Sequence, residues 1–148
     1  FFFVFFCGDY GRGLGLAIVL ACVGGGIVKK EGILAGRCDY YDEELILNTH
    51  LERPKVPKNT IYNYSYYPIL FKSEDELLAV VSELNKNSIN PRRYFYPSLN
   101  NLPYLSVSTS CPVSEDISSR ILCLPLYPDL EMRDVEKICE IVKKISLV

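Results

Sequence analysis

The sequence predicts a small α/β domain in which helices cover mainly one face of a short mixed or antiparallel sheet. Segments rich in β-branched and aromatic residues alternate with segments whose apolar residues recur at helical spacing. Of the 148 residues, 49% are hydrophobic and 23% are charged, which excludes the disordered, collagen-like and coiled-coil classes. A chain of this length hides roughly 70% of its unfolded surface when it folds, so it can build a real core.

The chain divides into three segments. Residues 1–47 hold an apolar strand candidate followed by a broadly helical pattern. Three glycines at residues 24–26 would cost about 1 kcal/mol each in a helix interior, so we expect two helices with a break between them. Residues 48–60, with two prolines, form a connector. Residues 61–148 form the small α/β domain.

The first elements of this domain have clear local signals. Residues 61–71 are aromatic and β-branched and predict a strand, with Pro68 at an edge or bulge. Ser73 and Glu76 then match a capping box, which predicts that a helix begins there. The predicted apolar face of this helix is the following set: Leu77, Leu78, Val81 and Leu84.

The remaining elements alternate in the same way. We expect a strand at residues 92–96, a polar loop at 100–110, a short helix at 114–120 and a buried strand at 121–128. The last helix, at residues 129–145, has charged residues opposite one apolar stripe. The stripe consists of Val135, Ile138, Cys139, Val142 and Ile145.

Several classes of function are excluded by charge and spacing. The net charge is −2 and the basic residues are scattered, so we expect no nucleic-acid partner. The uncharged run at residues 13–28 is shorter than the roughly 20 residues that span a bilayer and holds five glycines, so we expect no membrane segment. The turn at residues 8–15 reads G-x-G-x-G, which fits neither the dinucleotide fingerprint nor a P-loop.

The cysteine and histidine content argues against metal and triad chemistry. The six cysteines never reach C-x-x-C spacing and are interpreted as buried apolar residues of a cytoplasmic protein. His50 is the single histidine, and we expect it to be a solvated loop residue. We therefore predict no metal ligands and no catalytic triad within this chain.

Residues 90–104 carry the densest cluster of functional groups, and they read NPRRYFYPSLNNLPY. Arg92 and Arg93 offer forked donors suited to a diphosphate or a carboxylate. The three rings of Tyr94, Phe95 and Tyr96 can alternate between the core and a cleft, where they would meet a base or a sugar. An alternative stays open, in which the tyrosines are packing residues and the arginines form a solvated edge.

The motifs R-R-Y-F-Y-P and L-P-L-Y-P, in this order and separated by a helix, resemble the end of the DegT/DnrJ/EryC1/StrS family of nucleotide-sugar aminotransferases. The similarity runs over residues 62–146. It implies the small domain of a fold type I enzyme, which uses pyridoxal 5'-phosphate (PLP) to move an amino group from glutamate onto a nucleotide-linked keto sugar. R-R-Y-F-Y-P is most similar to the branch that acts on dTDP-4-keto-6-deoxy sugars. The resemblance also implies a homodimer with its site at the subunit interface.

The resemblance implies roles for seven residues. The implied substrate contacts are Arg92, Arg93, Tyr94, Tyr96 and Asn100. Asn100 stands near the place of a sugar-binding histidine in many relatives. Gly11 and Arg12 stand where relatives carry N-G-K-M or N-Y-R-M beside the cofactor, although Tyr10 replaces the asparagine that reaches the PLP phosphate across the dimer.

Two functions remain open at this stage. No lysine of the chain lies in the surroundings expected of the PLP lysine, and the chain opens with Phe1 and no methionine. We therefore expect a C-terminal portion of a longer aminotransferase, inert by itself because the imine-forming lysine lies elsewhere. The alternative is a non-catalytic small α/β binding or interaction module, for which the missing lysine is equally expected.

Overall fold

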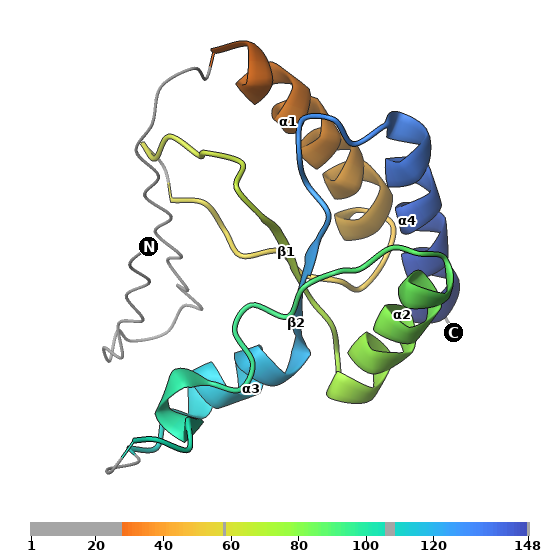
Figure 1. Cartoon of the computed structure of the whole chain (residues 1–148). Helices are drawn as coiled ribbons and strands as arrows, with labels where there is room; N and C mark the ends of the chain where they lie inside the picture. The colour runs from red at the N-terminus through yellow and green to blue at the C-terminus, as the bar shows by residue number, and fades with distance from the viewer. Residues whose placement is uncertain (1–27, 58, 106–108, 148) are drawn as a thin grey trace.

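The computed structural model describes residues 28–57, 59–105 and 109–147 (Figure 1). Four α-helices, a π-helical turn, a 3-10 turn and two strands follow one another in this part of the chain. In chain order they are α1 (Val28–Tyr41), η1 (Asp42–Ile46), β1 (Tyr67–Leu70), α2 (Glu74–Lys86), η2 (Leu99–Asn101), α3 (Pro112–Arg120), β2 (Ile121–Leu124) and α4 (Met132–Ser146). Residues 1–27, which include Gly11, Arg12 and the predicted glycine break, lie outside the described residues.

The two strands form an antiparallel pair, in which Tyr67 lies opposite Leu124 and Leu70 lies opposite Ile121. Each strand also makes one isolated bridge on its outer edge: Leu70 of β1 pairs with Glu52, and Cys123 of β2 pairs with Arg92. In Figure 1, α1, α2 and α4 lie together on one side of the strands, while α3 lies apart at one end. The predicted fold class is confirmed, with helices mainly on one face of a small antiparallel sheet.

The core lies between the sheet and helices α2 and α4. The predicted stripe of α4 is confirmed, since Val135, Ile138, Cys139 and Val142 are buried and Ile145 packs partly buried against them. These side chains recur every three or four residues, so that one face of the helix covers the sheet. This packing supplies the apolar burial that stabilises the domain.

Helix α2 begins where the sequence predicted. The Ser73 hydroxyl accepts a hydrogen bond from the Glu76 backbone N–H at 3.2 Å, as a capping box requires. The Glu76 carboxylate reaches the backbone N–H of Lys72 and not that of Ser73. The predicted apolar face is partly wrong, because Val80 is buried and Leu78 is 46% exposed.

The predicted strand at residues 61–71 is longer than the one found. β1 is confined to Tyr67–Leu70, because the chain before it folds locally. Tyr64 has a positive φ of 50°, and the Asn63 side chain accepts from the Ser65 backbone N–H. Pro68 sits as predicted at an edge: its ring nitrogen lies on the same outer side as the Leu70 groups that bond Glu52.

The strand predicted at residues 92–96 is wrong. Only Arg92 pairs with β2, and the chain then turns. Side-chain contacts, described below, hold this stretch instead of backbone hydrogen bonds to β2. β2 ends at Leu124, where Pro125 follows, and not at residue 128. The predicted short helix exists as α3 and begins two residues earlier, with Pro112 in its first turn.

Helix α1 continues into η1, where Leu45 is buried and Ile46 partly buried. His50 lies in a loop as predicted but is not fully solvated, because its Nε2 lies 2.9 Å from a Glu76 oxygen in a half-buried pair. Among the described cysteines, Cys38, Cys123 and Cys139 are buried thiols, as expected, whereas Cys111 is only half-buried. In the described part of the chain, no helix has the length and apolar character needed to cross a membrane.

Arg37 joins α1 to the chain that follows β2. Its guanidinium is 8% exposed and donates hydrogen bonds to the backbone carbonyls of Leu130, at 2.7 Å, and Pro128, at 3.1 Å. A third hydrogen bond goes to the Ile33 carbonyl one helical turn earlier. The hydrogen bonds to these three carbonyls offset the free-energy cost of removing the charged guanidinium from water.

Candidate ligand-binding cleft

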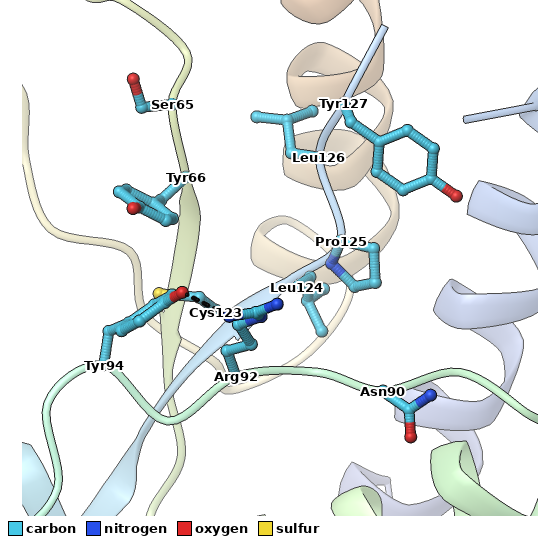
Figure 2. A pocket seen from close by; sticks show the side chains of 10 residues that line it. All are labelled: Ser65, Tyr66, Asn90, Arg92, Tyr94, Cys123, Leu124, Pro125, Leu126 and Tyr127. Atoms are coloured by element: carbon cyan, nitrogen blue, oxygen red, sulfur yellow. Dashed lines mark hydrogen bonds between the residues drawn. The ribbon is translucent and has the colours of Figure 1, made fainter. Parts of the chain in front are cut away.

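A cleft of about 290 Å³ opens beside the sheet (Figure 2). Its walls come from the chain before β1, from β2 and the segment after it, and from residues 90–94. The lining residues are Ser65, Tyr66, Asn90, Arg92, Tyr94, Cys123, Leu124, Pro125, Leu126 and Tyr127. Three chain segments that are distant in sequence therefore meet at one hollow.

The backbone of Arg92 fixes one wall of the cleft to β2. Its N–H donates to the Cys123 carbonyl at 3.1 Å, and the Cys123 N–H donates back to the Arg92 carbonyl at 2.9 Å. Consecutive side chains of an extended backbone point in opposite directions. The bridge thus places the Arg92 side chain in the cleft, while Arg93 lies on the other side of the chain.

The Arg92 side chain contacts one tyrosine, which in turn contacts a second. Its Nη1 donates to the Tyr94 hydroxyl at 3.0 Å, an interaction drawn in Figure 2. The Tyr94 ring in turn makes an edge contact with the Tyr66 ring, with centroids 5.1 Å apart. The cleft therefore presents a guanidinium beside two aromatic rings, which suits an anionic ligand that also carries a ring.

Arg92 has no carboxylate partner among the described residues; Arg37 has none there either, but its guanidinium bonds three backbone carbonyls. Four others are paired as follows: Arg53 with Asp42, Arg93 with Glu74, Arg120 with Asp116, and Arg133 with Glu131. No Asp or Glu lines the cleft. The forked donors of Arg92 thus face the cleft with their charge unneutralised, which favours a phosphate or carboxylate there.

The structure places the other predicted substrate residues outside the cleft. Arg93 points toward α2 and α3, and the Tyr96 ring stacks against its guanidinium at 3.6 Å. Asn100 donates to a Glu115 oxygen at 2.6 Å and accepts from the Ser98 hydroxyl at 2.6 Å. Of the five residues, only Arg92 and Tyr94 come together in the cleft. Substrate contact by the other three stays a prediction.

A buried polar cluster supports the opposite wall. The Asp42 carboxylate accepts from Arg53 at 2.6 Å and from the Tyr67 hydroxyl at 2.7 Å. Burial, together with the hydrogen bond to Asp42, raises the pKa of Tyr67. The Tyr62 hydroxyl donates to the Tyr66 carbonyl at 2.6 Å. These contacts hold the chain at Tyr66, so that its ring stays at the cleft.

Sequence reasoning missed Tyr66 and Tyr127 as cleft residues. Both lie in stretches that the sequence predicts to be strands, residues 61–71 and 121–128. The available signal was the second motif, because L-P-L-Y-P ends in Tyr127, whose side chain is half-exposed at the cleft. Because Pro125 ends the strand, the tyrosine that follows it lies outside the sheet, and this position could have indicated Tyr127 as a cleft residue.

The described residues do not supply covalent or metal chemistry. Burial raises the pKa of the Cys123 thiol to about 12, so this group is neutral and a poor nucleophile. Within the described ranges, no group of His, Cys, Asp and Glu side chains could hold a metal ion. Of the lysines whose side chains the structure describes, none is buried and none lines the cleft, so these side chains do not fit a covalent PLP site.

The comparisons with known proteins decide the family. A family model described as the DegT/DnrJ/EryC1/StrS aminotransferase family matches residues 34–143, which is more than half of the chain. The chain belongs to this family. The match begins at residue 34 and not near residue 62, so the DegT likeness includes most of α1 and the connector. Gly11 and Arg12 precede the match as well as the described residues, and their cofactor role stays a prediction.

Curated relatives show what kind of enzyme carries such a segment. A dTDP-4-amino-4,6-dideoxy-D-glucose transaminase of Escherichia coli is 37% identical over 94 residues, which cover 57% of this chain and 24% of the relative. A UDP-N-acetyl-3-dehydro-α-D-glucosamine 3-aminotransferase of Acidithiobacillus ferrooxidans is 25% identical over 108 residues, 71% of this chain and 28% of the relative. The chain thus spans about a quarter of the length of these relatives.

Solved structures agree on the fold. An aminotransferase from Streptoalloteichus hindustanus has a TM-score of 0.70 at 22% sequence identity. The match includes 77% of this chain and 31% of that structure. A Bacillus subtilis protein with bound PMP has a TM-score of 0.62 at 18% identity, with 78% of this chain and 28% of that structure covered. At these identities the likeness establishes the small α/β fold and nothing finer.

Proposed function

We propose that this chain is the C-terminal small-domain portion of a PLP-dependent aminotransferase that transfers the amino group of glutamate to a nucleotide-linked keto sugar. The observation that carries the proposal is the unneutralised guanidinium of Arg92, which lies beside Tyr66 and Tyr94 in a DegT-family fold. The substrate class is of the dTDP-4-keto-6-deoxyhexose type. Support for this choice is the higher identity to the transaminase that is named for a dTDP-linked amino sugar.

In this proposal the chain binds and orients substrate. Arg92 takes the diphosphate or a carboxylate through charge-assisted hydrogen bonds, and the tyrosine rings pack against the base or sugar. PLP, when bound, supplies the electron sink that labilises the bonds at the amino-bearing carbon. Its lysine is proposed to belong to another part of the polypeptide, since none of the lysines whose side chains the structure describes is buried. The isolated chain is then inert.

The proposed assembly is a cytoplasmic homodimer with its site between subunits. Such an arrangement explains why the cleft is open on the described chain: Arg92 is exposed, and half of the Tyr127 side chain is in contact with solvent. Gly11 and Arg12 are proposed to lie near the cofactor. Asn100 is proposed to influence the choice of sugar through the loop that follows Arg92.

The test uses the full-length polypeptide that carries this chain, supplied with glutamate and dTDP-4-keto-6-deoxyglucose. We expect the amino sugar nucleotide as the product, identified by mass spectrometry. Arg92→Ala should lower kcat/KM about 100-fold, because a hydrogen bond to a charged group contributes about 1.5–3 kcal/mol. Arg133→Ala is the matched control, since Arg133 is exposed on α4 away from the cleft. Absence of amination with dTDP- and UDP-linked keto sugars would contradict the proposal.

The alternative function is a non-catalytic binding or interaction module. The chain carries no lysine in the surroundings expected of the PLP lysine, and both functions predict this equally. Absorbance separates the two functions. A full-length product with an imine band near the visible edge, lost on borohydride treatment, supports the aminotransferase, whereas a naturally short and colourless product supports the module.

A further inference from the structure

Residues 93–97 have little backbone support. Arg92 is the last residue of this stretch that pairs with β2, and the next local backbone bond in the loop runs from Asn101 to Ser98. Among the described residues, no backbone-to-backbone hydrogen bond involves positions 93–97. The Tyr94 backbone N–H bonds the Cys123 sulfur, and the Tyr94 side chain contacts Arg92 and Tyr66. The rest of the stretch must be held by other side-chain contacts.

Arg93 provides these contacts. Its Nη2 donates to a Glu74 oxygen and to the Ser119 carbonyl, both at 2.7 Å. The Tyr96 ring covers the guanidinium plane at 3.6 Å. One side chain thus connects the loop with the first residue of α2 and the last turn of α3.

The environment of Arg93 is that of a structural cation. A guanidinium at the C-terminal turn of a helix and a carboxylate at the N-terminal turn both match the helix dipoles. The side chain is 19% exposed, and its Nε is buried with no hydrogen-bond partner among the described residues. Arg93 does not line the cleft. Its Nη2 donates only to protein groups, whereas the donors of Arg92 face the ligand space.

We propose that Arg93 is a positioning residue, which holds residues 93–97 against α2 and α3 so that Arg92 and Tyr94 face the cleft. The inference rests on the proposed function for its assay, and it replaces the expectation that both arginines contact the substrate. The planar fork of arginine is needed, because lysine cannot bond a carboxylate and a carbonyl while stacking on a ring. Glu74, whose carboxylate accepts a hydrogen bond from Arg93, is the second positioning residue of this contact.

The decisive experiment compares Arg92→Met and Arg93→Met in the full-length enzyme. KM for the dTDP-linked keto sugar is measured from 50 to 500 mM NaCl, because salt screens an exposed charge that attracts an anion. For Arg93→Met we expect about a tenfold rise in KM, kcat within about twofold, and an unchanged salt dependence of KM, since Arg92 is still present. Arg92→Met should raise KM and flatten that dependence.

Arg120→Met is the matched control. Arg120 also bonds a carboxylate, that of Asp116, and a main-chain carbonyl, that of Phe71, but it does not hold the loop. The same substitution there removes the same kind of contacts, and KM should change less than twofold. If Arg120→Met raised KM as much as Arg93→Met does, the effect would reflect general destabilisation of the fold, and the inference would be overturned.

Glu74→Gln provides a second route if Arg93→Met does not fold. It removes the charge that Arg93 pairs with and leaves both arginines in place. We expect a KM rise of about threefold to tenfold, and the double variant should show much less than the product of the two single effects, because both act through one contact. Independent effects would contradict a positioning role.

Binding of dTDP, followed by isothermal titration calorimetry, distinguishes failure of the inference from failure of the proposed function. If the wild-type enzyme neither binds dTDP nor aminates a dTDP sugar, the proposed function fails. If it does both, and Arg93→Met leaves KM and the dTDP Kd unchanged or flattens the salt dependence, only the positioning role fails. An approximately tenfold weaker Kd with unchanged salt dependence supports it.

Discussion

The face where α2 and α4 cover the sheet and the loop at residues 90–105 are built in opposite ways. The covered face is a continuous set of buried apolar side chains at helical spacing. The loop has one bridge to β2, and charged or polar side chains hold the rest of it. The difference shows that apolar burial determines the domain, while a few long-range polar contacts determine the cleft. Among the described arginines, the loop holds one without a carboxylate partner, and it faces a ligand space.

The largest contrast should appear in thiol reactivity. Burial raises the pKa of Cys38, Cys123 and Cys139 from 9.0 to about 12, whereas Cys111 lies half-buried where the loop enters α3. At pH 8 the thiolate fraction of a group with pKa 12 is about a thousandth of that of an ordinary thiol. We expect iodoacetamide to label Cys111 first, as read by peptide mass spectrometry. Rapid labelling of Cys38 and Cys139, which belong to the apolar core, without denaturant would show that the covered face is open.

The same pKa shifts set a pH dependence of stability. The unfolded chain loses these thiol protons near pH 9, while the folded chain keeps them up to about pH 12. Stability from these groups is therefore complete below pH 9 and is lost as the pH rises from 9 toward 12. Urea unfolding at pH 8 and pH 10.5 should give a lower free energy of unfolding at the higher pH.

Adjacent leucines of α2 test the covered face more directly. Leu77 is fully buried and Leu78 is 46% exposed on the same helical turn. Leu77→Ala should lower the free energy of unfolding by about 2–5 kcal/mol, because it removes buried methyl groups and leaves a cavity. Leu78→Ala should cost less than about 1 kcal/mol. Equal losses in urea denaturation would mean that this face of α2 is assigned incorrectly.

Two arginines should respond differently to one substitution. Arg37→Met leaves the carbonyls of Leu130 and Pro128 without a donor and should cost on the order of 3 kcal/mol of stability. Arg92→Met removes an exposed side chain with no carboxylate partner in the described part of the chain, so stability should stay within about 0.5 kcal/mol. Thermal unfolding measures both variants, and a large loss for Arg92→Met would assign that side chain a structural role.

The smallest expected effect concerns the start of α2. Ser73→Ala removes the cap of the Glu76 N–H and should cost about 1 kcal/mol. Ser82, exposed in the middle of the same helix, is the control, and Ser82→Ala should be neutral or slightly stabilising, because alanine favours helix. Chemical denaturation of the two variants separates capping from helix propensity. Equal effects would contradict the capping role.

Local signals in the sequence predicted most of the fold. The stripe of α4 and the cap at Ser73 depend on residues within a few positions of one another, and both are found. The strand expected at residues 92–96 failed because Arg93 is held by Glu74 and Ser119, which no local pattern reveals. His50 was misjudged for the same reason, since its partner is 26 residues away.

The cleft was predictable only in part. A pair of arginines among aromatic residues indicated a binding loop, and Arg92 and Tyr94 do line the cleft. Which of two neighbouring arginines faces the ligand depends on the register of one bridge to Cys123, because a shift by one residue exchanges the two sides. Tyr66 and Tyr127 join the site through tertiary packing. The L-P-L-Y-P motif could have indicated Tyr127, whereas no local pattern indicated Tyr66.

Arg37 gives the domain a mechanical property. Its guanidinium fastens α1 to residues 128–130, which directly continue the segment of the cleft wall that ends at Tyr127. A rotation of α1 would therefore be transmitted to that wall through the hydrogen bonds of one buried guanidinium. We expect the first described helix and this part of the ligand-facing surface to shift together.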